Sequence, residues 1–223
     1  SAVCLDGSAA HRARGIVCRW TYYARDQKSL APKVKETWQA EKSRQTRDRI
    51  IASTISLIRE GGFSAASSKR IAERSGMTWG AAQHHFGSKE QIFDAVILLS
   101  HERFTARFAD IEVDRRSLKN RVSDFIDRMW AHYQDEVYLA AIEIIMASRD
   151  SESGHTQEVV FDWPSKDHIA LMTRVFGDSG RRPSDLLDVL IFVHSLLTGL
   201  TITKVMGGGR AKLDLYLVHA KSA

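Results

Sequence analysis

The chain has 223 residues, of which 43% are hydrophobic and 26% charged, the balance of an ordinary soluble globular protein. The two cysteines, Cys4 and Cys18, do not suggest a disulfide framework, and the start of the sequence does not suggest secretion. We therefore expect a cytoplasmic protein without a cofactor, metal or membrane partner. The net charge of +5 divides into +8 over residues 1–91 and −3 over residues 92–223, which favours a basic module that meets a polyanion and a second module with another role.

Residues 1–42 have no regular apolar pattern, and we predict a basic, flexible arm there. Two interpretations of this arm stay open. Its arginines and lysines could lie along the minor groove of DNA, or the segment could be a solvated extension without a role. An uneven but solvated surface would also produce the charge asymmetry, so a motif must decide.

The rest of the chain is predicted to be all-α, because apolar residues recur at helical spacing and hairpin sequences between alternating apolar runs are missing. We predict helices at 44–59, 88–108, 117–134, 136–149, 157–176 (interrupted at Pro164), 184–205 and 212–220. The stretch 184–205 is the most apolar, but it contains Asp188, His194 and Lys204, which favours a buried helix over a membrane span.

Between the first two of these helices, residues 67–86 have the pattern of a helix-turn-helix. Ser67 and Thr78 are placed to cap the two short helices, because a hydroxyl oxygen can accept from a backbone N–H that is free at a helix start. Gly76 provides the tight turn between them. The inward-facing positions are expected to be Ile71, Ala72, Met77 and Phe86.

The segment from Arg44 to Val96 resembles the DNA-binding domain of the TetR family of bacterial transcriptional regulators. The family pattern stands here as Gly61-Gly62-Phe63, Ile71-Ala72, Gly76-Met77-Thr78, His85-Phe86 and Ser88-Lys89-Glu90. The resemblance implies an N-terminal helix-turn-helix DNA-binding domain at 43–96. It also implies a larger helical domain at 97–223, which binds an effector and forms the dimer.

By position, the resemblance implies a set of residues that contact DNA: Ser68, Lys69, Thr78, Trp79, Ala81, Gln83, His84, His85 and Lys89. Three of these depart from the family's usual residues. Ala81 and Gln83 replace Thr and Tyr, so a hydroxyl contact to phosphate is missing at each position, although Gln83 could pair with adenine instead. Trp79 replaces a polar or basic residue, and could pack on a thymine methyl or a sugar.

The resemblance also implies an effector pocket among the later helices. The candidate lining residues are Phe125, Met129, Trp130, Tyr133, Ile142, Glu143, Met146, Phe161, Trp163, Phe176 and His194. Aromatic and methionine side chains at helical spacing also form plain core, so both interpretations stay open for each. Glu143, in an apolar run, would meet either an effector's polar end or a buried partner such as an arginine.

A homodimer interface is expected along one apolar stripe. Its candidate residues are Leu186, Leu190, Val193, Leu197 and Thr201, joined by Leu213 of the closing helix. An exposed stripe of this size would favour aggregation unless a second copy covered it. The alternative, for half of these residues, is that the stripe faces the core of its own protomer.

We therefore expect a ligand-responsive, DNA-binding regulator that is not an enzyme. The favoured form is a repressor that a small, largely apolar effector releases from a palindromic operator. Two alternatives stay open: a helical protein-interaction module that has lost DNA binding, and a small helical enzyme. His84 and His85 are adjacent, which does not suit metal ligation from a helix, and His132 with Glu136 is interpreted as a solvated pair.

Overall fold

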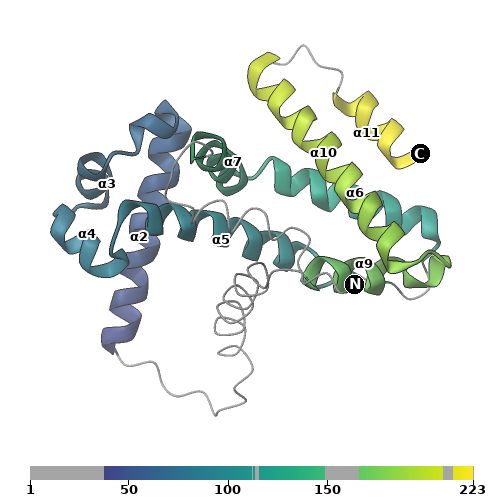
Figure 1. Ribbon diagram of the computed structural model, residues 1–223, viewed down its shortest axis with the longest axis horizontal. Coiled ribbons are helices and arrows are strands. Elements are labelled where there is room, and N and C mark those ends of the chain that lie inside the picture. Colours follow the sequence, from purple (N-terminus) through teal and green to yellow (C-terminus); the bar gives the residue numbers. More distant parts are fainter. Residues whose placement is uncertain (1–37, 112, 114–115, 149–165, 208–212, 223) are drawn as a thin grey trace, which may run out of the picture. The chain divides into compact units, whose positions relative to one another are not determined.

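A computed structural model describes residues 38–111, 113, 116–148, 166–207 and 213–222 of the chain. Over these residues the protein is helical and has no strand, which confirms the all-α prediction (Figure 1). The chain divides into two compact units, Ser1–Lys42 and Ser43–Ala223. The α-helices are α2 (Trp38–Gly61), α3 (Ser68–Ser75), α4 (Trp79–Phe86), α5 (Lys89–Arg107), α6 (Leu118–Tyr133), α7 (Glu136–Ser148), α9 (Lys166–Phe176), α10 (Pro183–Gly207) and α11 (Leu213–Ser222), with short 3-10 turns η2 (Phe63–Ala65) and η3 (Gly177–Ser179).

The predicted and observed helices agree to within a few residues, apart from two segments. Helix α2 begins at Trp38, ahead of the predicted start at Arg44, because residues 38–43 are compatible with a helix but lack the apolar spacing that would reveal it. Of the helix predicted at 157–176, the structure describes Lys166–Phe176, and the interruption at Pro164 lies outside the described residues.

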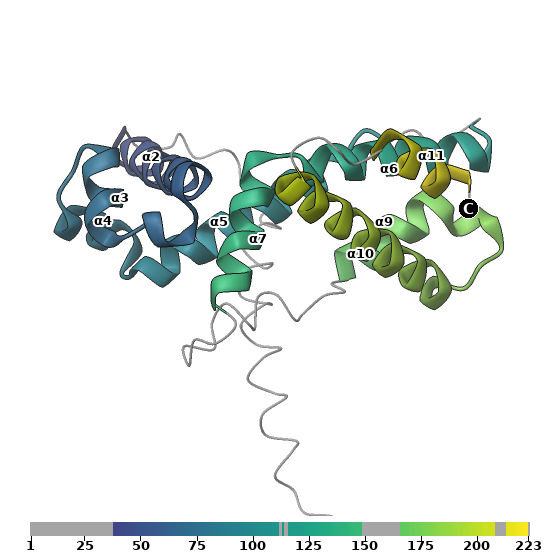
Figure 2. The same ribbon diagram turned by 90° about the horizontal axis from the view of Figure 1, so that it is seen from above.

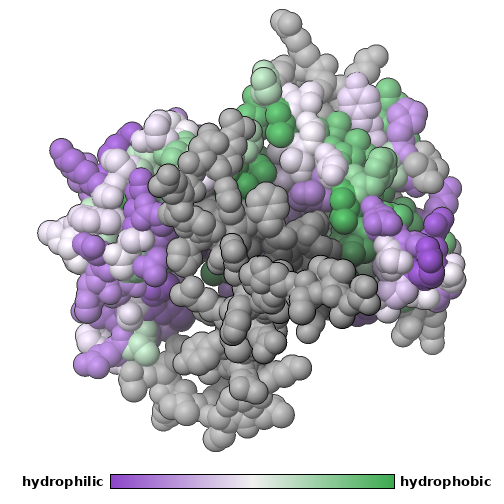
Figure 3. Space-filling model, viewed as in Figure 1, coloured by the Kyte–Doolittle hydropathy of each residue, from purple (hydrophilic) through white to green (hydrophobic). Residues whose placement is uncertain are grey.

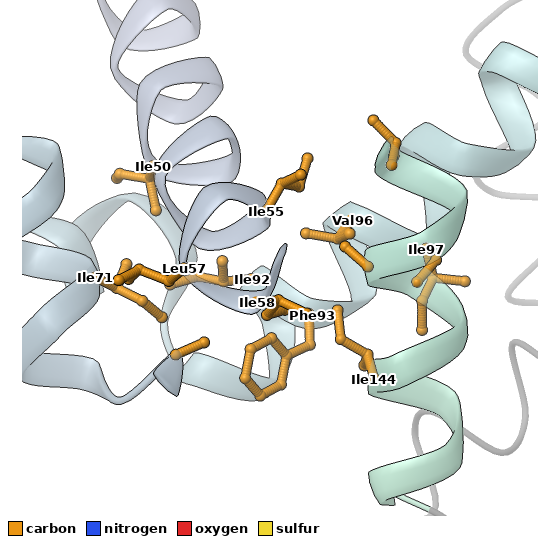
Figure 4. Packing of buried hydrophobic residues seen from close by; sticks show 14 of the residues in the cluster. Ile50, Ile55, Leu57, Ile58, Ile71, Ile92, Phe93, Val96, Ile97 and Ile144 are labelled. Carbon is orange, nitrogen blue, oxygen red and sulfur yellow. The ribbon is translucent and has the colours of Figure 1, made fainter. Parts of the chain in front are cut away.

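The first hydrophobic cluster, here called the N-terminal core, is almost entirely aliphatic (Figure 4). Its buried residues are Ile50, Ile55, Leu57, Ile58, Ala66, Ile71, Ala82, Phe86, Ile92, Phe93, Val96, Ile97, Val137, Ala140, Ala141 and Ile144. The last four belong to α7, which follows the predicted domain boundary at residue 96 by about forty residues of sequence. The helix-turn-helix region therefore completes its interior with a helix from the second half of the chain.

The second cluster, here called the C-terminal core, is richer in aromatic rings. Its buried residues are Phe104, Phe108, Ile111, Phe125, Met129, Tyr133, Tyr138, Met172, Val175, Phe176, Leu186, Leu190, Leu197 and Leu200. Helices α5 and α7 contribute to both clusters, and they pack directly on each other. Figure 2 shows α5 extending from α3 and α4 toward α9, so a displacement of this helix would be felt in both cores.

Candidate DNA-binding site

The two helices of the predicted helix-turn-helix form from local signals in the sequence. The Ser67 hydroxyl accepts from the Arg70 N–H at 3.4 Å, and the Thr78 hydroxyl accepts from the Ala81 N–H at 3.2 Å. Gly76 ends α3 in the left-handed conformation, with φ 70°, which a residue with a Cβ adopts only at a cost. Both predicted caps and the predicted turn are thus confirmed.

Helix α4 has one face inside the protein and one outside. Ala82 and Phe86 are buried in the N-terminal core, while Ala81, Gln83 and His84 are exposed. Since α4 has only eight residues, it is too short to be stable alone, and its buried face and its cap must hold it in place. The result is a short helix whose polar side chains point outward.

The predicted DNA contacts fall into two classes of exposure. The exposed residues are Lys69, Thr78, Ala81, Gln83 and His84, and the half-buried residues are Ser68, Trp79, His85 and Lys89. Lys69 is 84% exposed, and its ammonium lies 3.9 Å from the Glu73 carboxylate. The ammonium of Lys89 lies 5.4 Å from the centre of the Phe93 ring. Trp79 packs against the N-terminal core, so part of its ring is buried and only the exposed part is available to DNA.

Two arginines support these helices and were not singled out in the sequence. Arg74 of α3 donates to both carboxylate oxygens of Glu60 at 2.7 Å, and this pairing lowers the pKa of Glu60 to about 2. Arg47 of α2 donates to the carbonyl oxygen of His85, and its guanidinium carbon lies 4.0 Å from the centre of the Phe86 ring. These partners are 14 and 38 residues apart, so no local spacing in the sequence reveals them.

Those residues predicted to line an effector pocket that the structure describes differ in burial. Phe125, Met129, Tyr133 and Phe176 are buried in the C-terminal core, Trp130, Ile142, Glu143 and His194 are half-buried, and Met146 is exposed. Phe161 and Trp163 lie outside the described residues. The Oε2 atom of Glu143 lies near Gly62, at the end of α2, about 3.8 Å from where a Cβ on that glycine would be.

A pocket of about 250 Å³ lies between α5 and α9. Its lining residues are His101, Phe104, Thr105, Phe108, Asp167, His168, Ala170, Leu171 and Arg174, none of which was predicted. Its rings form a row: His168 has its centroid 5.3 Å from those of both His101 and Phe104, and Phe108 follows at 5.0 Å from Phe104. Burial lowers the pKa of His168 to about 4, so this side chain is neutral at physiological pH.

Polar side chains continue from this pocket into the C-terminal core. Tyr133 and His194 are hydrogen-bonded, and the Tyr138 and Thr198 hydroxyls lie 3.0 Å apart. His132 is only 5% exposed, so the predicted solvated pair with Glu136 is wrong: burial, and then the nearby Arg107, lower the pKa of His132 to about 4. Over the described residues, no group of three His, Cys, Asp or Glu side chains is placed to hold a metal ion.

Helix α10 turns the predicted dimer stripe toward its own protomer. Leu186, Leu190, Leu197 and Thr201 are buried there and Val193 is half-buried, while the side chain of Leu213 lies outside the described set. Other apolar residues of α10 and α11 are exposed instead: Val189, Ile191, Phe192, Ile202, Val205, Met206, Leu215, Tyr216 and Val218. Figure 3 shows hydrophobic side chains gathered over α10, whereas the surface of the N-terminal helices is mostly hydrophilic.

The same helix has the length and hydropathy of a membrane span. Over Pro183–Met206 only 28% of the most apolar window is buried within the protein, so much of the apolar surface of α10 is not covered by its own protomer. A single helix of this kind is weak evidence for a membrane, because helices that pack in soluble proteins have the same composition.

Comparison with known proteins agrees with the helix-turn-helix found in the N-terminal helices. Residues 50–96 match the family model of bacterial regulatory proteins of the tetR family. The HTH-type transcriptional regulator UidR of Escherichia coli K12 is 40% identical over 65 residues, which are 29% of this chain. The match covers only 33% of the length of UidR, so the similarity does not extend over the whole of that protein.

Solved structures extend the likeness of fold to most of the chain. The TetR-family regulator PfmR from Thermus thermophilus has a TM-score of 0.57 at 19% identity, covering 78% of this chain and 96% of its own. A TetR-family regulator from Mesorhizobium loti has a TM-score of 0.62 at 16% identity, covering 81% of this chain and 93% of its own. The helix-turn-helix of this chain is therefore similar to that of the tetR family of bacterial regulators, and the fold of most of the chain resembles that of TetR-family structures.

Proposed function

We propose that this protein is a DNA-binding transcriptional regulator that reads its operator with α4. The observation that carries the proposal is the two-sided character of α4, whose inner residues are buried while Ala81, Gln83 and His84 face solvent. A short helix with exposed side chains on its outer face has the size and chemistry to enter the major groove. The charge balance of +8 over residues 1–91 supports a polyanionic partner.

In this proposal the two helices have different roles on the duplex. Helix α3 lies across the sugar–phosphate backbone, where Ser68 and the exposed Lys69 meet phosphates. Helix α4 lies in the groove, where the Gln83 amide can donate to and accept from adenine in a bidentate pair. Lys89, at the start of α5, contributes a further phosphate contact, and His85 lies near phosphates.

The test is selection of bound fragments from genomic DNA, followed by affinity measurements on an enriched fragment and on random DNA. Gln83→Ala should weaken binding to the fragment by roughly tenfold to a hundredfold, as the loss of one bidentate base contact would, while binding to random DNA changes little. Lys119→Ala, an exposed change on α6, serves as the control. Failure to enrich any fragment, or equal losses on both DNAs, would contradict the proposal.

The DNA-bound form is proposed to be a homodimer joined through the exposed apolar residues of α10 and α11. Phe192, Val205 and Val218 are 65%, 64% and 60% exposed, and Met206 is 83% exposed. Soluble proteins rarely leave such a group of side chains uncovered, and a second copy would pair this face with itself. On DNA, the two copies of α4 in such a dimer must lie about 34 Å apart to enter successive major grooves.

The oligomeric state tests the dimer directly. Phe192→Asp should shift the protein toward monomer in sedimentation at micromolar concentration, because a charge would be buried in the interface. Leu118→Asp places the same charge on an exposed leucine of α6 and should leave the dimer intact. An unchanged dimer after Phe192→Asp, or a monomeric unmodified protein, would exclude this surface.

We further propose that a small, largely apolar effector binds the pocket between α5 and α9 and releases the operator. The row of rings from His101 to Phe108 suits a flat apolar molecule. Helix α5 lines this pocket and also packs on α4, so a shift of α5 would change the spacing of the recognition helices. The protein would then be a cytoplasmic repressor.

A pocket-filling variant tests the direction of this response. Leu171→Trp should mimic a bound effector and weaken operator binding, whereas Thr173→Trp, an exposed position on the same helix outside the pocket lining, should not. Tighter operator binding by Leu171→Trp would point to an activator-like response instead. Equal affinity for both variants would remove the pocket from the proposal.

A further inference from the structure

A long side chain from another helix contacts the C-terminal end of α4. Arg47 of α2 donates from its Nη1 atom to the carbonyl oxygen of His85. The same guanidinium lies over the neighbouring ring, with its carbon 4.0 Å from the centre of Phe86. One arginine thus contacts two consecutive residues at the point where the helix ends.

The carbonyl that Arg47 reaches is one that the helix itself leaves without a partner. The last four carbonyl groups of any α-helix lack intrahelical N–H donors. In α4 the Gly87 N–H serves Gln83, and Arg47 serves His85. A cation at this end also complements the negative pole of the helix dipole.

Arg47 belongs to a helix that is anchored in the N-terminal core. Helix α2 places Ile50, Ile55, Leu57 and Ile58 in the N-terminal core, in the turns that follow Arg47. The N-terminal end of α4 is held by the Thr78 cap, and its middle by the buried Ala82. Without Arg47, the last turn, which contains Gln83 and His84, would lose this contact with α2 and keep the Phe86 ring and the Gly87 N–H bond.

Arginine suits this position better than lysine would. A guanidinium is planar, so it can stack on a ring and at the same time donate in its own plane. An ammonium has the same charge but cannot do both in this geometry. The two contacts made by Arg47 therefore depend on the shape of the side chain as well as on its charge.

We propose that Arg47 is a positioning residue for operator recognition: it orients the last turn of α4, and with it Gln83 and His84, without itself binding DNA phosphate. This rests on the proposed function, in which α4 reads the operator. Arg49, two residues further along α2, is exposed and provides a matched control.

Three variants of the chain test the proposal: Arg47→Ala, Arg47→Lys and Arg49→Ala. The readouts are the ratio of affinities for an enriched operator fragment and random DNA, the dependence of each affinity on salt, and hydrogen exchange of the α4 amides in the free protein. We expect both Arg47 variants to lower the affinity ratio by about tenfold and to speed exchange in the last turn of α4. The control should leave the ratio and the exchange unchanged.

A phosphate contact would give a different pattern. Loss of one such contact lowers both affinities together and reduces the salt slope by about one, with α4 exchange unaltered. That result for Arg47→Ala would overturn the proposal, and so would full recovery of the affinity ratio in Arg47→Lys. If the unmodified protein bound no DNA, the proposed function would fail, but the exchange measurement would still decide whether Arg47 orders α4. Exchange in the buried part of α10 reports whether a variant has simply lost its fold.

Discussion

The two hydrophobic cores differ in what they bury. Around the helix-turn-helix the buried polar groups of the described residues are hydroxyls, such as those of Thr54 and Ser75, which donate to carbonyls one turn back in their own helices. The C-terminal region instead buries Arg121, His132 and His168. An aliphatic interior, in which hydroxyls are hydrogen-bonded within their own helices, suits a rigid platform for DNA. The buried histidine rings of the second region instead make its stability sensitive to pH.

The largest expected effect tests whether α7 really belongs to the N-terminal core. Ile144 is fully buried, so Ile144→Ala should lower the free energy of unfolding by about 2–5 kcal/mol, measured by chemical denaturation. Amides of α2 and α5 should lose protection from hydrogen exchange, although they lie far from residue 144 in the sequence. Met146→Ala on the exposed side of α7 is the control and should have little effect.

Lowering the pH should destabilise the C-terminal region more than the helix-turn-helix region. The folded protein lowers the pKa of both His132 and His168 from 6.5 to about 4, so below pH 6.5 the unfolded chain takes up protons that the folded chain does not. The free energy of unfolding should therefore fall by about 1.4 kcal/mol per pH unit for each histidine as the pH drops from 6.5 toward 4.

His132→Phe should remove one of these two contributions, which denaturation at a series of pH values will measure. Hydrogen exchange at about pH 5, between the unfolded and folded pKa values, should loosen α6 and α9 before α3 and α4. A pH slope unaltered by His132→Phe, or earlier loosening of α3, would break the contrast between the two cores.

Two helix caps can be removed in matched variants, and the expected loss of stability is smaller. Thr78→Ala and Ser117→Ala each remove a side chain that accepts a backbone N–H at a helix start, so each should cost about 1 kcal/mol of stability. Only Thr78→Ala should also weaken operator binding, because it loosens α4. Equal losses of DNA affinity in the two variants would show that general stability, and not the cap of α4, controls binding.

The smallest expected effect concerns the ion pair on the outer side of α3. Glu73→Gln should change the free energy of unfolding by less than about 0.5 kcal/mol, because exposed pairs four residues apart contribute little. The same change leaves Lys69 without a competing carboxylate, so operator affinity should rise slightly at low salt. A fall in affinity would remove Lys69 from the proposed phosphate contacts.

The helix-turn-helix could be predicted from sequence because its signals are local. The Ser67 and Thr78 caps act over three residues, and Gly76 meets a local need for positive φ. Exposure of Gln83 and His84 follows from burial of Ala82 and Phe86 at helical spacing. For the C-terminal half, periodicity located the helices but could not say which apolar face of α10 turns inward, since both faces of that helix are apolar.

By itself, the sequence determined the helices, the caps, the turn and the resemblance of residues 50–96 to the tetR family, because each depends on residues close together in the chain. Only the tertiary structure decided that α7 completes the N-terminal core, that Leu190 and Leu197 are interior while Phe192 is exposed, and that Arg47 reaches the end of α4. These pairings join residues tens of positions apart, and their energies depend on how the helices pack, which no local pattern of residues records.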